Sequence, residues 1–134
     1  SKTNPIVEAL TTITGIGKMS AFQMAAEVGD FQRFDKPEAL VCYAGLAPMS
    51  NDSDGYRGPR KLPRRCNRQL RYLFYQAAQA ASRCKAPNRA RDTYRRVRQR
   101  WDSRSSKVAA AREIVADVFY TWKRMNLAMQ ALRE

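Results

Sequence analysis

Apolar residues recur at the spacing of a helix face over a long stretch in the middle of the chain, and no other feature constrains the fold as strongly. The side chains that follow the i, i+3, i+4, i+7 spacing are Leu70, Leu73, Phe74, Ala77, Ala81 and Cys84. Arg64, Arg68 and Arg71 lie on roughly the opposite side of this predicted helix, which should run from about residue 63 to residue 84. One face is therefore expected to pack in a core, and the other to present positive charge.

The chain before this helix is also expected to be helical. Asn4 can cap a first helix that has Pro5 at its first position, and a second helix should follow the turn at residues 14–17 and end near Gly29. Asp35 is expected to cap a short third helix. The inward-facing residues of the second helix are predicted to be Met19, Phe22, Ala25, Ala26 and Val28.

Two further helices complete the predicted fold. One is expected from about Pro87 to Trp101, and the last should follow a polar break at residues 102–106. The last helix carries apolar residues at helical spacing, namely Val108, Ala111, Val115, Val118, Phe119, Trp122 and Met125. Because no stretch alternates as a strand does, we predict an all-α fold.

The 134 residues are expected to form one small domain with a single core. Its predicted parts are an N-terminal helix-hairpin-helix (1–34), a long basic loop that contains a serine (45–62) and basic amphipathic helices (63–125). The chain starts without methionine and without the apolar segment of a signal peptide, so we expect a domain excised from a longer cytoplasmic protein. No apolar run has the length of a membrane span, and no membrane partner is expected.

Positive charge is concentrated in the middle of the chain. The net charge is +13, and residues 55–104 carry sixteen basic side chains against two acidic ones. Eighteen of the 25 basic residues are arginine, whose planar guanidinium can contact a phosphate through two parallel hydrogen bonds. So uneven a distribution of charge is typical of a protein that binds nucleic acid.

The composition argues against several kinds of site. The chain has no histidine, which removes the usual general base and the usual zinc ligand. Its three cysteines, Cys42, Cys66 and Cys84, lack the CxxC spacing of a metal site and are expected to be reduced packing residues. We therefore expect neither a disulfide framework nor a metal or other cofactor in this domain.

The turn between the first two helices contains Gly15, Ile16 and Gly17, followed by Lys18. Two glycines allow a tight turn and a close approach to a phosphate, which the free N–H groups and the positive end of the second helix would attract. Gly15, Gly17 and Lys18 are therefore candidate nucleic-acid contacts in a turn that resembles the helix-hairpin-helix, a motif that binds DNA backbone. The alternative is a plain helical hairpin whose glycines serve only its geometry.

A serine between two acidic residues precedes the basic stretch. Ser53 is flanked by Asp52 and Asp54, and taken alone this pattern is typical of a turn in which the side chain bonds to its own backbone. A hydroxyl beside many arginines could instead attack a phosphodiester, because guanidinium groups stabilise the charge that develops on phosphate oxygens. Phosphate binding without chemistry is the alternative for most of the basic residues. The candidate nucleic-acid contacts in this stretch are Arg57, Arg60, Lys61, Arg64, Arg65, Asn67, Arg68 and Arg71.

Several short motifs follow one another in a particular order. They are Gly15-Ile16-Gly17, residues 25–30, Gly45-Leu46-Ala47-Pro48 with a serine five positions later, Arg57-Gly58, residues 67–71 and Ala110-Ala111-Arg112. Together they resemble, over about the whole chain, the C-terminal domain of the bacterial insertion-sequence transposases that have a DEDD-type N-terminal domain. This group includes the pilin-gene invertase and the bridge-RNA-guided recombinases. Asp54 before Gly55, and Cys66 in place of a glycine, differ from the family pattern.

The resemblance implies an activity and a set of partners. In this family a RuvC-like N-terminal domain, absent from this chain, binds divalent metal such as Mg²⁺, and the C-terminal domain supplies a serine nucleophile. Ser53 matches the position of that serine, so it would form a transient link to a DNA phosphate during strand exchange. The implied partners are DNA, a structured guide RNA, the N-terminal domain and, at full length, further copies of the protein. The implied location is the nucleoid in the bacterial cytoplasm.

Three hypotheses follow from the sequence. The first is the serine-bearing domain of a transposase or site-specific recombinase, inactive as an isolated fragment. The second is a non-catalytic helix-hairpin-helix module that docks DNA or structured RNA for a catalytic partner. The third is an RNA-binding or assembly domain in which Arg95, Arg96 and Arg98 contact guide RNA.

Overall fold

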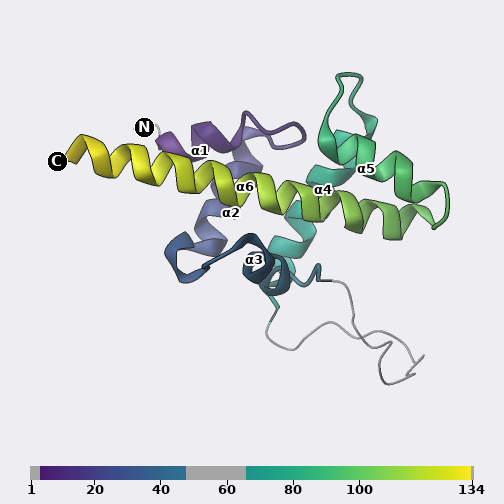
Figure 1. Cartoon of the computed structure of the whole chain (residues 1–134), viewed down its shortest axis with the longest axis horizontal. Helices are drawn as coiled ribbons and strands as arrows, with labels where there is room; N and C mark the ends of the chain where they lie inside the picture. Colours follow the sequence, from purple (N-terminus) through teal and green to yellow (C-terminus); the bar gives the residue numbers. More distant parts are fainter. Residues whose placement is uncertain (1–3, 48–65, 134) are drawn as a thin grey trace.

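The computed structural model describes residues 4–47 and 66–133 of the chain (Figure 1). In these two ranges the backbone forms six α-helices, one 3-10 turn and no strand, which confirms the predicted all-α fold. The elements are α1 (Pro5–Leu10), α2 (Lys18–Val28), η1 (Phe31–Arg33), α3 (Pro37–Tyr43), α4 (Arg68–Arg83), α5 (Arg89–Arg98) and α6 (Ser103–Arg133). None of the helices in these ranges is long and apolar enough to cross a membrane.

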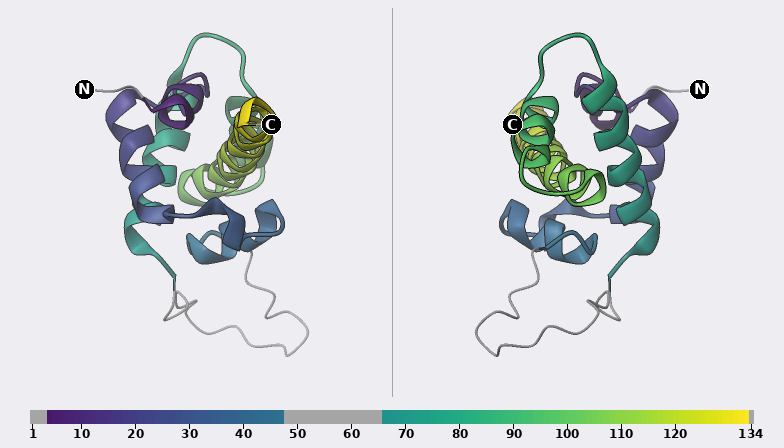
Figure 2. Two further views of the ribbon diagram at one scale, coloured as in Figure 1. Left: turned by 90° about the vertical axis from the view of Figure 1, so that its left-hand side faces the viewer. Right: turned by 90° about the vertical axis from the view of Figure 1, so that its right-hand side faces the viewer.

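The last helix organises the fold. α6 has 31 residues and contacts α1, α3, α4 and α5. Figures 1 and 2 show α6 running along the long axis of the molecule, with the shorter helices arranged around it. Its buried residues include Ala110, Ile114, Val118 and Trp122, which recur every four positions along one face. Burying one side chain the size of Ile or Val stabilises the fold by about 1.5–3 kcal/mol, so this face makes a large contribution.

Asparagine side chains determine where three helices begin. Asn4 accepts a 2.9 Å hydrogen bond from the N–H of Ile6, which confirms its predicted role as the cap of α1. Asn67 and Asn88 cap α4 and α5 by accepting the N–H group three residues later, at 2.9 and 2.8 Å. Both helices therefore begin later than predicted. α4 starts at residue 68 rather than 63, after two non-helical residues, and α5 starts at residue 89 rather than 87.

Two further boundaries differ from the prediction. Asp35 does not cap α3, because the residue that precedes the helix is Lys36 and no side chain caps it. The last helix begins at residue 103, inside the predicted polar break. Asp102 explains this early start, since its carboxylate accepts the N–H of Ser105 at 2.8 Å and its carbonyl accepts the hydroxyl of Ser106 at 2.7 Å.

The buried face of α2 is not the predicted one. Met19 and Phe22 are 70% and 62% exposed, and Ala26 is also exposed. The helix instead buries Ala21 and Met24 together with Val28, and Ala25 packs partly buried against the core, so the prediction is confirmed for Val28 and in part for Ala25. Both sets of residues have helical spacing, and α2 contacts α1 and α4. The small side chain of Ala21 suits the buried position between helices, a preference that apolar periodicity does not reveal.

Trp101, the predicted end of the fifth helix, lies outside that helix. Its side chain is 64% exposed, and α5 ends three residues before it. The buried residues of α5 are Ala90 and Thr93. With so few apolar side chains to bury, α5 leaves most of its arginines in solvent.

Candidate nucleic-acid interface

The predicted site residues divide between the two parts of the chain. Gly15, Gly17, Lys18, Asn67, Arg68 and Arg71 lie within the ranges that the structure describes. Ser53, Asp52, Asp54, Arg57, Arg60, Lys61, Arg64 and Arg65 lie outside those ranges. The structure therefore describes the surroundings of the candidate site. These are the α1–α2 hairpin, the residues on either side of segment 48–65, and the basic helices.

The residues on either side of segment 48–65 are in contact. The N–H of Asn67 donates a 2.6 Å hydrogen bond to the carbonyl oxygen of Tyr43. A Cβ atom added to Gly45 would lie 3.1 Å from the Sγ atom of Cys66. α3 and the beginning of α4 accordingly lie at the same end of the molecule (Figure 2). We call residues 43–47 and 66–67 the loop stem.

The first part of the loop stem, residues 43–47, is held by the end of α3. Gly45 has a positive φ of 73°, a conformation that glycine adopts without strain. The N–H groups of Gly45 and Leu46 donate to the carbonyls of Cys42 and Val41, both at 3.0 Å, so they close the C-terminal turn of the helix. Leu46 is 1% exposed and thus anchored in the core.

Arg112 of α6 contacts the same part of the loop stem. Its Nε atom donates a 2.7 Å hydrogen bond to the carbonyl oxygen of Leu46. Burial lowers the pKa of the Arg112 guanidinium. The sequence motif Ala110-Ala111-Arg112 contributed to the resemblance but gave no role for the arginine. A charged residue inside the apolar stretch of the last helix was the signal that could have indicated one.

The second part of the loop stem, residues 66–67, is held by the side chain of Asn67. Besides capping α4, its Nδ2 group donates to Oε2 of Glu27 at 2.9 Å and to the hydroxyl of Tyr43 at 3.3 Å. The guanidinium of Arg33 lies 4.6 Å from the centre of the Tyr43 ring. The pKa of Tyr43 is lowered from its ordinary 10.0, first by the hydrogen bond from Asn67 and then by Arg33. The side chain of Asn67 thus has three partners within the chain, and its contact with nucleic acid stays a prediction.

Two of the predicted arginines lie beside the stem. Arg68 is exposed at the first position of α4. The Cδ atom of Arg71 would lie 3.4 Å from a Cβ atom on Gly45, so this side chain passes directly along the stem. The Nε atom of Arg71 is buried and has no hydrogen-bond partner among the residues described. An arginine with an unused donor is thus present where segment 48–65 begins and ends.

The two glycines of the α1–α2 turn have different surroundings. Gly15 has a φ of 97°, and a Cβ atom there would lie 2.3 Å from the carbonyl oxygen of Ala77 in α4. Its smallness therefore serves packing against α4. Gly17 precedes α2, with nothing within 4 Å of an added Cβ, and Lys18 beside it is exposed. The open beginning of α2 is thus the part of the turn that a phosphate could reach.

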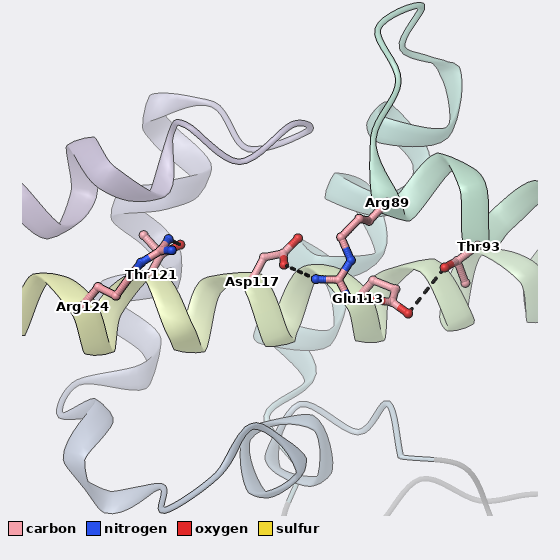
Figure 3. Close-up of polar contacts among 6 residues, drawn as sticks. All are labelled: Arg89, Thr93, Glu113, Asp117, Thr121 and Arg124. Atoms are coloured by element: carbon pink, nitrogen blue, oxygen red, sulfur yellow. Dashed lines mark hydrogen bonds and ion pairs between the residues drawn. The ribbon is translucent and has the colours of Figure 1, made fainter.

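A second polar cluster joins α5 to α6 (Figure 3). The guanidinium of Arg89 contacts Glu113 at 2.9 Å and Asp117 at 3.3 Å, and Thr93 donates to Glu113 at 3.4 Å. Burial raises the pKa of Asp117 from its ordinary 3.8, and Arg89 opposes this effect. Arg89 therefore stabilises the packing of α5. The cluster borders a groove of about 460 Å³ lined by Thr12, Ile13, Thr14, Asn88, Arg89, Ala90, Ile114, Asp117, Tyr120, Thr121 and Arg124.

The remaining arginines of α5 face solvent. Arg95, Arg96 and Arg98 are exposed, and Arg98 donates to the carbonyl oxygen of Trp101 at 3.1 Å. The chain also has no cluster of three or more His, Cys, Asp or Glu side chains within residues 4–47 and 66–133. The exposed arginines of α5 therefore offer cationic contacts to a partner.

Comparison with known proteins identifies the family. Residues 7–95, well over half of the chain, match the family described as transposase IS116/IS110/IS902. The chain is 35% identical over 88 residues to an uncharacterised 44.8 kDa protein of insertion element IS116 from Streptomyces clavuligerus, covering 66% of this chain and 22% of that protein. It is 29% identical over 83 residues to the transposase for insertion sequence element IS1111A from Coxiella burnetii, covering 62% of this chain and 23% of that protein.

A probable family 20 transposase from Pseudomonas aeruginosa is 30% identical over 78 residues, covering 58% of this chain and 23% of that protein. The chain thus spans less than a quarter of the length of each of these relatives. No solved structure matches it. On the extent of the family match, the chain belongs to the IS116/IS110/IS902 family of transposases.

Proposed function

We propose that this chain is the C-terminal, serine-bearing and DNA-binding domain of a DEDD-type insertion-sequence transposase, and that Ser53 is its nucleophile. Membership of a transposase family supports the reaction class. The observation that carries the proposal is the loop stem: the residues that flank segment 48–65 are held together by the hydrogen bond from Asn67 to Tyr43, beside Arg68 and Arg71.

In the proposed step, the hydroxyl oxygen of Ser53 forms a bond to a DNA phosphorus, and the bond from that phosphorus to a deoxyribose oxygen breaks. The serine proton leaves to a base, for which Asp52 and Asp54 are candidates, and the deoxyribose oxygen takes up a proton. The hydroxyl oxygen of another DNA strand then forms a bond to the same phosphorus and gives up its proton to a base, while the bond from that phosphorus to Ser53 breaks and the serine oxygen takes up a proton, which joins the strands. Guanidinium groups stabilise the negative charge on the phosphate oxygens in both steps.

The cations of this step would come from the basic stretch and the start of α4, namely Arg57, Arg60, Lys61, Arg64, Arg65, Arg68 and Arg71. The open beginning of α2 would hold DNA backbone through Gly17 and Lys18, with Gly15 keeping the turn against α4. A divalent metal such as Mg²⁺ would add Lewis-acid activation from a RuvC-like domain outside this chain.

The proposed partners follow from the same assignment. They are DNA, the protein's own N-terminal domain, further copies of the full-length protein and a structured guide RNA, all at the nucleoid of a bacterial cell. The exposed arginines of α5, Arg95, Arg96 and Arg98, are the proposed RNA contacts. The isolated 134-residue chain is expected to bind nucleic acid without cutting or joining it.

The test is Ser53→Ala in the full-length transposase, with Ser82→Ala as control. Ser82 lies on α4, where its hydroxyl donates only to the carbonyl of Gln79 at 2.8 Å. We expect Ser53→Ala to abolish strand exchange and leave DNA binding intact, while Ser82→Ala recombines normally. Normal recombination by Ser53→Ala would leave the second hypothesis, a non-catalytic binding module, which the solvent-facing arginines of α5 also support.

A further inference from the structure

The hydrogen bond from Arg112 to Leu46 joins two parts of the chain that are 66 residues apart. Leu46 is the last fully buried residue before segment 48–65. Its own N–H is already bonded to Val41, so the direction of the chain at this point is set by two contacts: one to α3 through the N–H and one to α6 through the carbonyl. Arg112 supplies the second contact.

The contact between Arg112 and Leu46 places a charged side chain partly out of water. The guanidinium of Arg112 is half-buried, and burial lowers its pKa. Among the residues described, salt bridges involve Arg89 and its two carboxylates, so Arg112 is a partly buried charge without an acidic partner there. Leu46 is only 1% exposed, so its carbonyl oxygen is a buried acceptor that depends on Arg112 for a hydrogen bond, and leaving it unpaired would lower stability. The Arg112 side chain therefore ties the residues just before segment 48–65 to α6.

We propose that Arg112 is a positioning residue, which holds residues 43–47 of the loop stem against α6, immediately before the serine-bearing segment. This inference rests on the proposed function of Ser53. Because Asn67 holds residues 66–67 through Tyr43, the two contacts restrain the residues on both sides of segment 48–65. A nucleophile on that segment depends on them for its alignment with the phosphate.

The experiment compares Arg112→Met and Arg112→Lys in the full-length transposase. Methionine keeps most of the aliphatic part of the arginine side chain and loses the hydrogen-bond donor. Lysine keeps a donor that can reach the carbonyl of Leu46. We expect Arg112→Met to lower the rate of strand exchange at saturating DNA by about 10- to 100-fold, with DNA affinity unchanged. Arg112→Lys should restore most of the rate.

The matched control is Arg124→Met, which removes the same charge from the same helix. Arg124 is exposed, and its guanidinium donates to the hydroxyl of Thr121 at 3.4 Å. We expect this variant to recombine at the wild-type rate. Equal losses in Arg124→Met and Arg112→Met would overturn the proposal, because they would reflect a general effect of charge on α6.

Amide hydrogen exchange gives a readout that does not depend on catalysis. Without the donor, the amides of Leu46 and Asn67 should exchange about tenfold faster, the equivalent of one hydrogen bond, while the centre of α4 stays protected. Unchanged exchange at the stem in Arg112→Met would sink the inference whatever the rate of recombination. Normal recombination by Ser53→Ala would instead remove the proposed nucleophile, and the exchange at Leu46 would still decide the role of Arg112.

Discussion

Gly15 lies so close to Ala77 that a Cβ atom at position 15 would be 2.3 Å from the Ala77 carbonyl oxygen. The contact is between the α1–α2 turn and the backbone of α4, which cannot move as a side chain can. Ile16, next to it, is 5% exposed and anchors the turn in the core. The hairpin is therefore attached to the basic helix, about 14 Å along α4 from Arg68 at 1.5 Å per residue.

Gly15→Ala is expected to destabilise the protein by about 2–4 kcal/mol, because it combines a backbone clash with an unfavourable positive φ. Gly17→Ala is the matched control, since Gly17 has ordinary φ and nothing within 4 Å. It should cost less than about 1 kcal/mol, the difference between glycine and alanine as a helix cap. Urea unfolding measures both. Similar losses in the two variants would show that the contact with Ala77 is not what requires glycine.

Asn67→Ala should raise the pKa of Tyr43 back toward 10.0, because the hydrogen bond from Asn67 is the main cause of its lowering. NMR titration of the tyrosine measures this change. Because the pKa of Tyr43 is lowered on folding, its ionisation stabilises the folded protein: this contribution is fully present above the unfolded value of 10.0 and is lost as the pH falls through the folded value. A neutral-pH loss of about 1 kcal/mol is expected from the missing cap.

The control for this prediction is Asn88→Ala, which removes the equivalent cap of α5. It should lower stability by a similar amount and leave the titration of Tyr43 unchanged. If Asn67→Ala also left that titration unchanged, the amide would not be the group that stabilises the tyrosinate.

Asp117 is expected to make stability depend on pH. Its pKa is raised in the folded state, so the folded protein binds the proton more tightly than the unfolded chain. Its contribution therefore favours folding below the ordinary 3.8 and is lost as the pH rises through the raised value. Asp117→Asn should remove this decline, as measured by urea unfolding from about pH 3 to about pH 7. A wild-type pH profile in this variant would contradict the assignment.

Arg89→Gln is expected to lower the free energy of unfolding at neutral pH. It leaves the carboxylates of Glu113 and Asp117, which Arg89 contacts at 2.9 and 3.3 Å, without their guanidinium. We expect a loss of about 1 kcal/mol in the free energy of unfolding at pH 7, and a smaller loss in acid, where the carboxylates are protonated. Equal losses at both pH values would mean that the side chain acts through packing alone.

Reversing the charge of Arg95, Arg96 and Arg98 to glutamate should abolish retention of structured RNA and leave the fold intact, since all three side chains are exposed. In a salt titration at low salt, any binding that remains should have a slope of log affinity against log salt concentration that is smaller by about 2–3, as three phosphate contacts are lost. The control reverses three exposed cations at the end of α6, namely Lys123, Arg124 and Arg133. Intact RNA binding by the α5 variant would count against the assignment.

The sequence predicted the type of the elements well because each long helix has one apolar face. The apolar positions Leu70, Leu73 and Phe74 are all buried as expected. It failed for the orientation of α2, where two apolar sets have helical spacing and the packing surface of α4 decides between them. The contacts of the loop stem could not be predicted from the sequence, for a different reason. Arg112 and Leu46 are 66 residues apart, and periodicity carries no information on pairs so distant.

The contact between the first and last helices has a consequence for synthesis. α1 packs on α6, and the ring of Phe31 stacks on that of Trp122 at 5.1 Å. The N-terminal helices thus lack one side of their core until residues near 122 have left the ribosome. Contacts between distant parts of a chain slow folding, since the loop between them must first close. The domain should therefore fold only after its translation is nearly complete, and a chain that stops short of Trp122 should stay a substrate for chaperones and proteases.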